Sequence, residues 1–254
     1  MSSDNVDYGL STDKILNKVV DIFKKEFPRN SSGKNLDIGS GTGALVQLIQ
    51  HHCPEFIPTC VDYTTELIQD KSIKVDVVDL NLEKLPYADN QFDFVSCTEV
   101  VEHLENFRLV IREAYRVTKP NCLVVFTTPN TLNLLSRVRY LWTGFQNLFG
   151  PLDVGRGEFF STGGHITPVS WFFLSHALAE AGFDDIEFTI DKKQSSAYPL
   201  MLIFYPLIVL FGARSFAREK RKGFMNSSNE KLIQPINSLD MLLGRTIVVS
   251  ARKK

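Results

Sequence analysis

A glycine-rich turn is the part of this sequence whose residue types and spacing point most directly to chemistry. In LDIGSGTGAL, residues 36–45, an apolar run is followed by Gly39, Gly41 and Gly43 and then by a helical pattern. Glycines at this spacing let the backbone turn sharply and pass close to a ligand, while the start of the helix offers unpaired N–H groups. Because loops that bind dinucleotides and nucleotides look similar, the motif by itself leaves the ligand open.

Acidic residues at the ends of three expected strands narrow the choice of ligand. Asp37 precedes the glycines, where its charge would repel a pyrophosphate but suits a ligand that carries an ammonium and a sulfonium. Asp62 ends the second strand, where a carboxylate can accept hydrogen bonds from ribose hydroxyls, and Asp79-Leu80-Asn81 ends the third, where an adenine edge could be recognised. Each acid alone could equally be a helix cap or a turn former. Together they favour a ligand crevice at one sheet edge.

The elements around these residues must form a parallel sheet to bring the strand ends together. From residue 34 to 128, apolar runs of strand length alternate with helical patterns, which is typical of βαβ units in a doubly wound α/β fold. We expect a single domain, 1–254, with a core at 30–191 that is completed by a final strand. The other segments expected are an N-terminal helix at 11–27, helical patterns at 64–70 and 131–149, a glycine-rich lid at 150–166, a helix capped by Thr167, an apolar and basic insertion at 192–243, and the final strand at 244–252.

As a set, these motifs resemble the class I S-adenosylmethionine-dependent methyltransferases. The resemblance is carried by LDIGSGTG, VDYTTELI, DVVDLNLEKLPYADNQFDFVSC and YRVTKPNCLVVFTTPN, and TEVVEHLEN is similar to a segment of ubiquinone-pathway O-methyltransferases and of bacterial methyltransferases that act on glycans or lipids. The resemblance implies a Rossmann-like seven-stranded sheet, S-adenosyl-L-methionine as cofactor and methyl transfer as the activity. The sequence departs from the family at Asn121, where Gly is usual, and in the insertion that separates the last two strands.

The resemblance also implies which residues bind the cofactor. The three glycines would face its methionine part, Asp62 the ribose, Asp79 and the Leu80 amide the adenine, and the residues just past the fourth strand the methionine end. The complete implied set is Asp37, Gly39, Ser40, Gly41, Gly43, Asp62, Tyr63, Asp79, Leu80, Asn81, Thr98 and Glu99.

Two histidines are the candidate catalytic residues. His103, directly after the fourth strand, titrates near neutral pH and is the first candidate for a general base, and a capping or supporting histidine is the alternative. His165 follows the glycine-rich loop, where it could anchor the lid, contact the substrate or take part in catalysis. His51 and His52 point to different helix faces without a carboxylate at ligand spacing, so we interpret them as surface residues and expect no metal.

Charge is distributed unevenly along the chain. The net charge is −1, but residues 1–191 hold 16 Lys and Arg against 26 Asp and Glu, while residues 192–254 hold 12 against 3. The uncharged run 195–213, in which Pro199 and Pro206 are expected to break a straight helix, lies directly before a basic cluster. Apolar surface beside basic residues suits an anionic membrane, so 195–222 is expected to make peripheral membrane contact, with 134–149 as a second such surface. Burial over the active site, a dimer contact and a membrane span are the alternatives.

These observations together predict a methyltransferase that acts on oxygen of a small apolar, lipid-linked or glycan acceptor at the cytoplasmic membrane face. The cytoplasm is expected because the four cysteines show no disulfide or zinc spacing and the first residues show no signal sequence. Carbon and nitrogen stay open as acceptor atoms, because the sequence shows no pocket motif specific for an acceptor. A non-catalytic cofactor-binding scaffold and a nucleic-acid methyltransferase are the alternatives. No nucleic-acid partner is expected, and an oligomer stays open.

Overall fold

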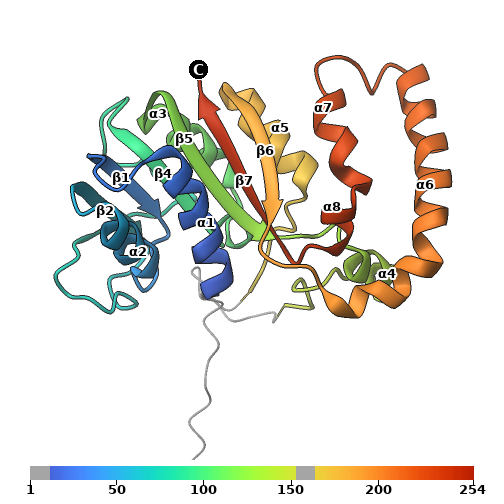
Figure 1. Cartoon of the computed structure of the whole chain (residues 1–254), viewed down its shortest axis with the longest axis horizontal. Helices are drawn as coiled ribbons and strands as arrows, with labels where there is room; N and C mark the ends of the chain where they lie inside the picture. The colour runs from blue at the N-terminus through green and yellow to red at the C-terminus, as the bar shows by residue number, and fades with distance from the viewer. Residues whose placement is uncertain (1–11, 153–163) are drawn as a thin grey trace, which may run out of the picture.

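The computed structural model describes residues 12–152 and 164–254, in which a seven-stranded sheet lies between layers of helices (Figure 1). The strand order is β3-β2-β1-β4-β5-β7-β6. The strands from β3 to β5 are parallel, and β7 is antiparallel to both of its neighbours. The expected Rossmann-like, doubly wound fold is thereby confirmed. The strands are β1 (Gly33–Ile38), β2 (Phe56–Asp62), β3 (Val75–Val77), β4 (Phe92–Thr98), β5 (Thr118–Pro129), β6 (Phe183–Ile190) and β7 (Thr246–Lys253).

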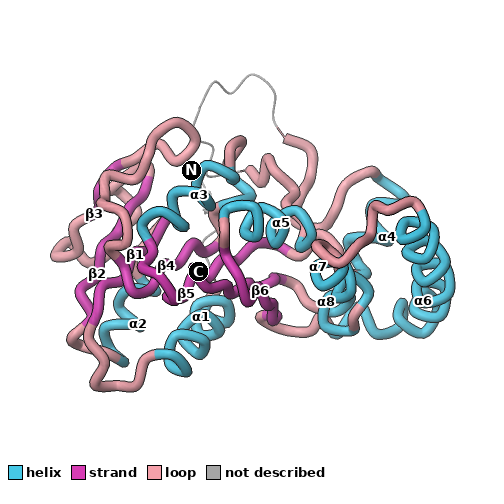
Figure 2. The backbone as a smooth tube through the Cα atoms, turned by 90° about the horizontal axis from the view of Figure 1, so that it is seen from above, coloured by secondary structure: helices cyan, strands magenta, loops and turns pink. Residues whose placement is uncertain are grey.

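Helices cover both faces of the sheet (Figure 2). One face packs against α1 (Asp13–Glu26) and α2 (Ala44–His52), and the other against α3 (Phe107–Val117) and α5 (Trp171–Ala181). The helices of the insertion, together with α4 (Leu134–Thr143), gather beyond β6 and β7 (Figure 1). The insertion contains η2 (Ser195–Ala197), α6 (Tyr198–Arg221), α7 (Glu230–Ile233), η3 (Gln234–Asn237) and α8 (Leu239–Leu243). The short helix η1 (Val101–His103) follows β4 instead and contacts α3 and β5.

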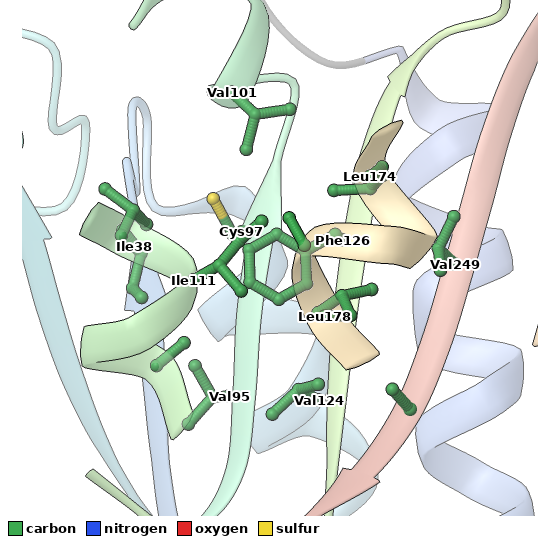
Figure 3. Packing of buried hydrophobic residues seen from close by; sticks show 14 of the residues in the cluster. Ile38, Val95, Cys97, Val101, Ile111, Val124, Phe126, Leu174, Leu178 and Val249 are labelled. Carbon is green, nitrogen blue, oxygen red and sulfur yellow. The ribbon is translucent and has the colours of Figure 1, made fainter. Parts of the chain in front are cut away.

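The alternation of side chains along the central strands explains why both faces are covered. In β5, Val124 and Phe126 join the core under α3 and α5, while Leu123 and Val125 join the core under α1 and α2. Phe126 is fully buried among side chains from several strands and helices (Figure 3). Burying such a side chain stabilises the fold by roughly 2–3 kcal/mol, so this strand anchors both layers and fixes the sheet edge that follows it.

Several expected local structures are wrong or shifted. Residues 64–70 form no helix, because this short segment folds over the glycine loop instead, with Gln69 donating its N–H to the Thr42 carbonyl. The helix expected at 131–149 ends at Thr143, because Gly144 adopts a left-handed conformation. The helix expected to be capped by Thr167 begins only after Ser170. The lid expected at 150–166 lies mostly outside the described residues.

The insertion differs from expectation in one respect: α6 is a single helix that continues through Pro206. Pro199 lies in the first turn, where no N–H is needed, and Pro206 removes only one bond from a helix of 24 residues. The helix, described along its whole length, has no buried residue. By length and composition 195–221 could cross a membrane, and 6% of its most apolar window is buried.

Candidate active site

The glycine loop is built as its sequence requires. Gly39, Gly41 and Gly43 all have positive φ, of 71°, 51° and 81°. A Cβ atom on Gly39 would collide with the Val100 side chain, and one on Gly43 would lie 2.6 Å from Cδ1 of Ile68. The loop therefore packs against Val100, just after β4, through Gly39, and against Ile68 through Gly43. Both close contacts are possible only because these two residues have no Cβ atom.

Two buried carboxylates flank this loop. Asp37 is 1% exposed and accepts a hydrogen bond from the Ser96 hydroxyl at 2.7 Å. Burial raises the pKa of Asp37 to about 7, and the nearby charge of Asp62 adds to the rise. Asp62 accepts the Gly41 and Tyr63 N–H groups at 2.8 and 2.7 Å, and burial raises its pKa as well. Because a buried carboxylate with a raised pKa gains from a cation or added hydrogen-bond donors, this pair suits a cationic, hydroxylated ligand.

The third acidic position lies beyond its strand, because β3 ends at Val77, two residues before Asp79. Asp79 instead organises a turn, in which its Oδ1 accepts the Asn81 N–H at 2.9 Å. The Asn81 side chain in turn accepts the Asn106 N–H at 3.1 Å. Leu80 is buried between these two polar residues. The turn thus joins the third strand to the segment after η1 and stays beside the sheet edge.

The segment after β4 supplies a second group of acids. Glu99 has φ 55°, and its carboxylate accepts the Thr127 hydroxyl from β5 at 2.9 Å, next to the buried Thr98. Burial raises the pKa of Glu99 to about 7, and the charge of Asp191 adds to the rise, while Arg245 opposes it. Asp191 and Arg245 flank the insertion and were not singled out from the sequence, because only the fold brings the ends of β6 and β7 to this place.

Glu102, His103 and His165 form a cluster beside these residues, with potential ligand atoms that all lie within 4.8 Å of one another. The imidazole rings are 4.9 Å apart, centre to centre. Nδ1 of His103 lies 2.9 Å from the Gly164 carbonyl, and Nδ1 of His165 lies 2.7 Å from the Leu148 carbonyl. Burial lowers the pKa of both histidines, so both rings are neutral at neutral pH.

Glu102 is the functional candidate that the sequence analysis did not select. It is completely buried, its Oε2 accepts the Thr128 hydroxyl at 3.1 Å, and burial together with the charge of Glu99 raises its pKa well above the ordinary value. The sequence offers one signal for Glu102, because a carboxyl directly before a histidine can belong to a metal or catalytic site. The third member of the cluster, His165, lies 63 residues further along the chain than Glu102, and only the fold shows that it is close.

His51 and His52 lie away from this edge, at the end of α2. His51 is exposed, and Nε2 of His52 contacts the Phe27 carbonyl at 3.1 Å. Among the residues that the structure describes, neither belongs to a cluster of metal-binding type.

Comparison with known proteins identifies the domain. Residues 36–126 match the family model described as a methyltransferase domain. These residues form a class I methyltransferase domain. The match runs from the end of β1 through the glycine loop and β4 into β5, and therefore includes every candidate cofactor-binding residue. The expected family, and S-adenosylmethionine as the cofactor of that family, are thus confirmed.

One curated relative and two solved structures illustrate the similarity. The ubiquinone/menaquinone biosynthesis C-methyltransferase UbiE of Desulfotalea psychrophila is 30% identical over 134 residues, which cover 49% of this chain and 52% of the relative. A SAM-dependent methyltransferase from Archaeoglobus fulgidus superposes with a TM-score of 0.56 at 17% identity, covering 93% of this chain and 94% of that one. Phosphoethanolamine N-methyltransferase 2 of Haemonchus contortus, in complex with S-adenosyl-L-methionine, gives 0.52 at 18% identity, covering 93% and 52%.

These similarities support the fold and the class of cofactor. The chain spans about half the length of the curated relatives that it matches. The residues around the glycine loop fit the cofactor of this family. Asp37 and Asp62 are buried acids whose pKa values burial raises, and the described residues place no cation against either of them. The Ser40 hydroxyl, buried in the loop, has no hydrogen-bond partner among the described residues.

Proposed function

We propose that this protein transfers a methyl group from S-adenosylmethionine to an oxygen atom of a small apolar, lipid-linked or glycan acceptor. The observation that carries this proposal is the contact between the glycine loop and the segment after β4, through Gly39 and Val100. This contact brings the glycine loop against Val100, the residue directly before η1, which carries Glu102 and His103 of the cluster. A methyl donor and a group able to accept a proton would therefore meet at one sheet edge.

The chain's own residues would hold the cofactor, which supplies a methyl group on a positively charged sulfur. Asp62 has four lone-pair positions and can keep its bonds to Gly41 and Tyr63 while it accepts the ribose hydroxyls. Asp37 would receive the ammonium group, and the turn at 79–81 would contact the adenine. Thr98, which ends β4, and Glu99, which follows it, would lie at the methionine end.

Transfer to oxygen requires that the acceptor hydroxyl lose its proton. The two neutral imidazoles are suited to promote this loss, because each presents an unprotonated nitrogen at neutral pH. We place the acceptor hydroxyl against the Glu102, His103 and His165 cluster for this reason. Carbon is the second candidate acceptor atom, since the bacterial relative described above is a C-methyltransferase by name.

A transfer assay tests this function. The full chain would be incubated with S-adenosylmethionine carrying a labelled methyl group and, in separate reactions, with hydroxylated lipids, glycans and RNA. We expect label in a lipid or glycan product, recovered as a methyl ether by mass spectrometry. Label on carbon would overturn the choice of oxygen, and label in RNA would favour a nucleic-acid methyltransferase. Binding of S-adenosylhomocysteine without transfer to any acceptor would favour a cofactor-binding scaffold.

We further propose that α6 brings the protein to an anionic lipid surface. Large apolar side chains are exposed along this helix, among them Leu202 at 83%, and Trp142 of α4 is 79% exposed at the same end of the molecule (Figure 1). Basic residues complete α6 and extend just beyond it, namely Arg214, Arg218, Lys220, Arg221 and Lys222. Apolar side chains next to positive charge are the combination that holds proteins to anionic bilayers.

Internal contacts orient this surface. Arg137 of α4 donates to the Asn237 side chain at 2.8 Å and to the Ile236 carbonyl at 2.7 Å. A Cβ on Gly212 of α6 would lie 2.6 Å from Nδ2 of the same Asn237, so α6 lies close against η3. One short segment thus holds both apolar helices, and an apolar acceptor arriving from the bilayer would find them next to the methyltransferase domain.

Vesicle sedimentation tests the membrane proposal. The protein should pellet with vesicles that contain anionic lipid and much less with neutral vesicles or at high salt. Leu202→Glu should reduce pelleting at least fivefold, while Leu239→Glu, at a position 50% exposed on α8, should not. Failure to pellet, combined with a mass in solution that doubles with concentration, would identify α6 as a dimer contact instead.

A further inference from the structure

We propose that Glu102, His103 and His165 bind a divalent transition-metal ion, which activates the acceptor hydroxyl. The sequence analysis expected no metal, because it considered only His51 and His52. The fold brings together two imidazoles and a carboxylate from η1 and from the segment before α5, with potential ligand atoms within 4.8 Å of one another. A donor set of two histidines and one carboxylate is that of catalytic zinc sites and of non-haem iron sites.

The backbone fixes which imidazole nitrogen is available. Carbonyl oxygens only accept hydrogen bonds, so Nδ1 of His103 carries the hydrogen that reaches the Gly164 carbonyl, and Nδ1 of His165 carries the one that reaches the Leu148 carbonyl. In both neutral rings the free lone pair is therefore on Nε2. Metal-binding histidines commonly donate their other N–H to a carbonyl in this way, which fixes the orientation of the ring before the metal arrives.

Glu102 provides independent evidence for a ligand. Its side chain is fully buried, Thr128 satisfies one oxygen, and the other, Oε1, has no partner among the described residues. A buried polar atom without a partner costs about 1–3 kcal/mol, and more for a charged group. A cation bound to Oε1 would remove this cost and would also compensate the nearby negative charge of Glu99.

Two hydrogen bonds hold the parts of the cluster in register. Thr167 donates its N–H to the Glu102 carbonyl at 2.9 Å, and its hydroxyl donates to the Leu104 carbonyl at 2.6 Å. These hydrogen bonds attach the segment that carries His165 to η1, next to His103.

The number of protein ligands indicates a catalytic rather than a structural role. Three ligands leave at least one coordination position open, whereas structural zinc sites are closed by four. The open position would lie beside Glu99, at the end of β4, where the acceptor is placed by the proposed function, on which this part of the inference rests. There the metal would bind the acceptor oxygen and lower its pKa, so that the hydroxyl loses its proton to solvent at neutral pH before it attacks the methyl group.

The test compares metal binding with cofactor binding in the same full-length preparations. The protein is freed of metal with a chelator, dialysed, and titrated with Zn²⁺, Mn²⁺ or Co²⁺, with the visible absorption of Co²⁺ as a spectroscopic readout. We expect one equivalent to bind the wild type and His51→Ala, a matched surface control. Glu102→Gln and His165→Ala should bind at least tenfold more weakly and lose the Co²⁺ spectrum, while all four proteins still bind S-adenosylhomocysteine.

Each possible result decides a separate point. Equal metal binding by all four proteins, or none by the wild type, would overturn the metal site and leave His103 as the candidate general base. Metal binding by the wild type without any binding of S-adenosylhomocysteine would overturn the proposed function but not the metal site. Retained S-adenosylhomocysteine binding in the variants separates loss of a ligand from loss of the fold.

Discussion

Replacing Asp37 with asparagine should stabilise the protein while weakening cofactor binding. Its pKa is about 7 in the folded protein, against 3.8 as the ordinary value, because the side chain is buried. The folded state therefore holds the proton more tightly than the unfolded state, and stability is lost as the pH rises from 3.8 to 7. A pKa difference of 1 corresponds to about 1.36 kcal/mol. The difference of about 3 for Asp37 therefore lowers the free energy of unfolding by roughly 4 kcal/mol at pH 8.

An asparagine side chain in place of the carboxylate would be neutral at every pH, and its amide oxygen could still accept the Ser96 hydroxyl. Asp37→Asn should therefore raise the free energy of unfolding by about 2–4 kcal/mol at pH 8, and by about 1–2 kcal/mol at pH 5. Urea denaturation at the two pH values measures both differences. A variant that is no more stable than the wild type at pH 8, or whose gain is independent of pH, would refute this reasoning.

The same substitution should act in the opposite direction on the ligand. In the wild type, Asp37 must lose its proton to receive the ammonium group, which makes binding of S-adenosylhomocysteine about tenfold weaker at pH 6 than at pH 8. The variant should lack this tenfold dependence and bind about 10–100-fold more weakly at pH 8, because a charged hydrogen bond contributes about 1.5–3 kcal/mol. Calorimetric titration at both pH values measures the effect, and unchanged affinity would remove Asp37 from the cofactor site.

Two further substitutions test the contacts that shape the site and its surroundings. Gly39→Ala should lower the free energy of unfolding by about 1–3 kcal/mol and weaken S-adenosylhomocysteine binding. The added Cβ would collide with Val100, and the backbone at this position has φ 71°, which alanine adopts only with strain. Unchanged unfolding and binding would contradict the contact between the loop and the segment after β4. Arg137→Ala should lower the free energy of unfolding by about 1–3 kcal/mol, because the carbonyl of Ile236 and the side chain of Asn237 lose a charged donor. Urea denaturation measures this change. An unchanged free energy of unfolding would mean that other contacts hold α4 to η3.

The central fold was predictable because its signals are local. Short apolar stretches mark the central strands, such as residues 123–126 of β5, while the glycine loop follows β1 directly and Asp62 ends β2. Asn121, which stands where Gly is usual in the family, has φ 61°, a left-handed conformation that Asn adopts more readily than most residues. Local signals failed at 64–70, because this segment packs over the glycine loop instead of forming a helix. They also failed at Pro206, because a helix of 24 residues continues on both sides of the one hydrogen bond that the proline removes.

The catalytic side of the site was only partly predictable. His103 and His165 were each selected for their chemistry, but nothing in the sequence shows that their rings lie 4.9 Å apart. Glu102 and Asp191 were overlooked because an isolated acid belongs to no periodic pattern, and for Glu102 the only local signal was the histidine that follows it. Their importance comes from burial and from neighbours that the chain brings in from 26 to 63 positions away, such as Thr128 and His165.

Binding of S-adenosylhomocysteine tests the central claim most directly. Calorimetric titration of the wild type should give micromolar affinity at one site per chain. Asp62→Ala should lose at least 100-fold in affinity, because Asp62 organises the loop through Gly41 and would receive the ribose hydroxyls. Glu55→Ala, which removes an exposed acid just before the other end of the same strand, should bind as the wild type does. Absence of binding by the wild type, or equal binding by all three proteins, would contradict the account.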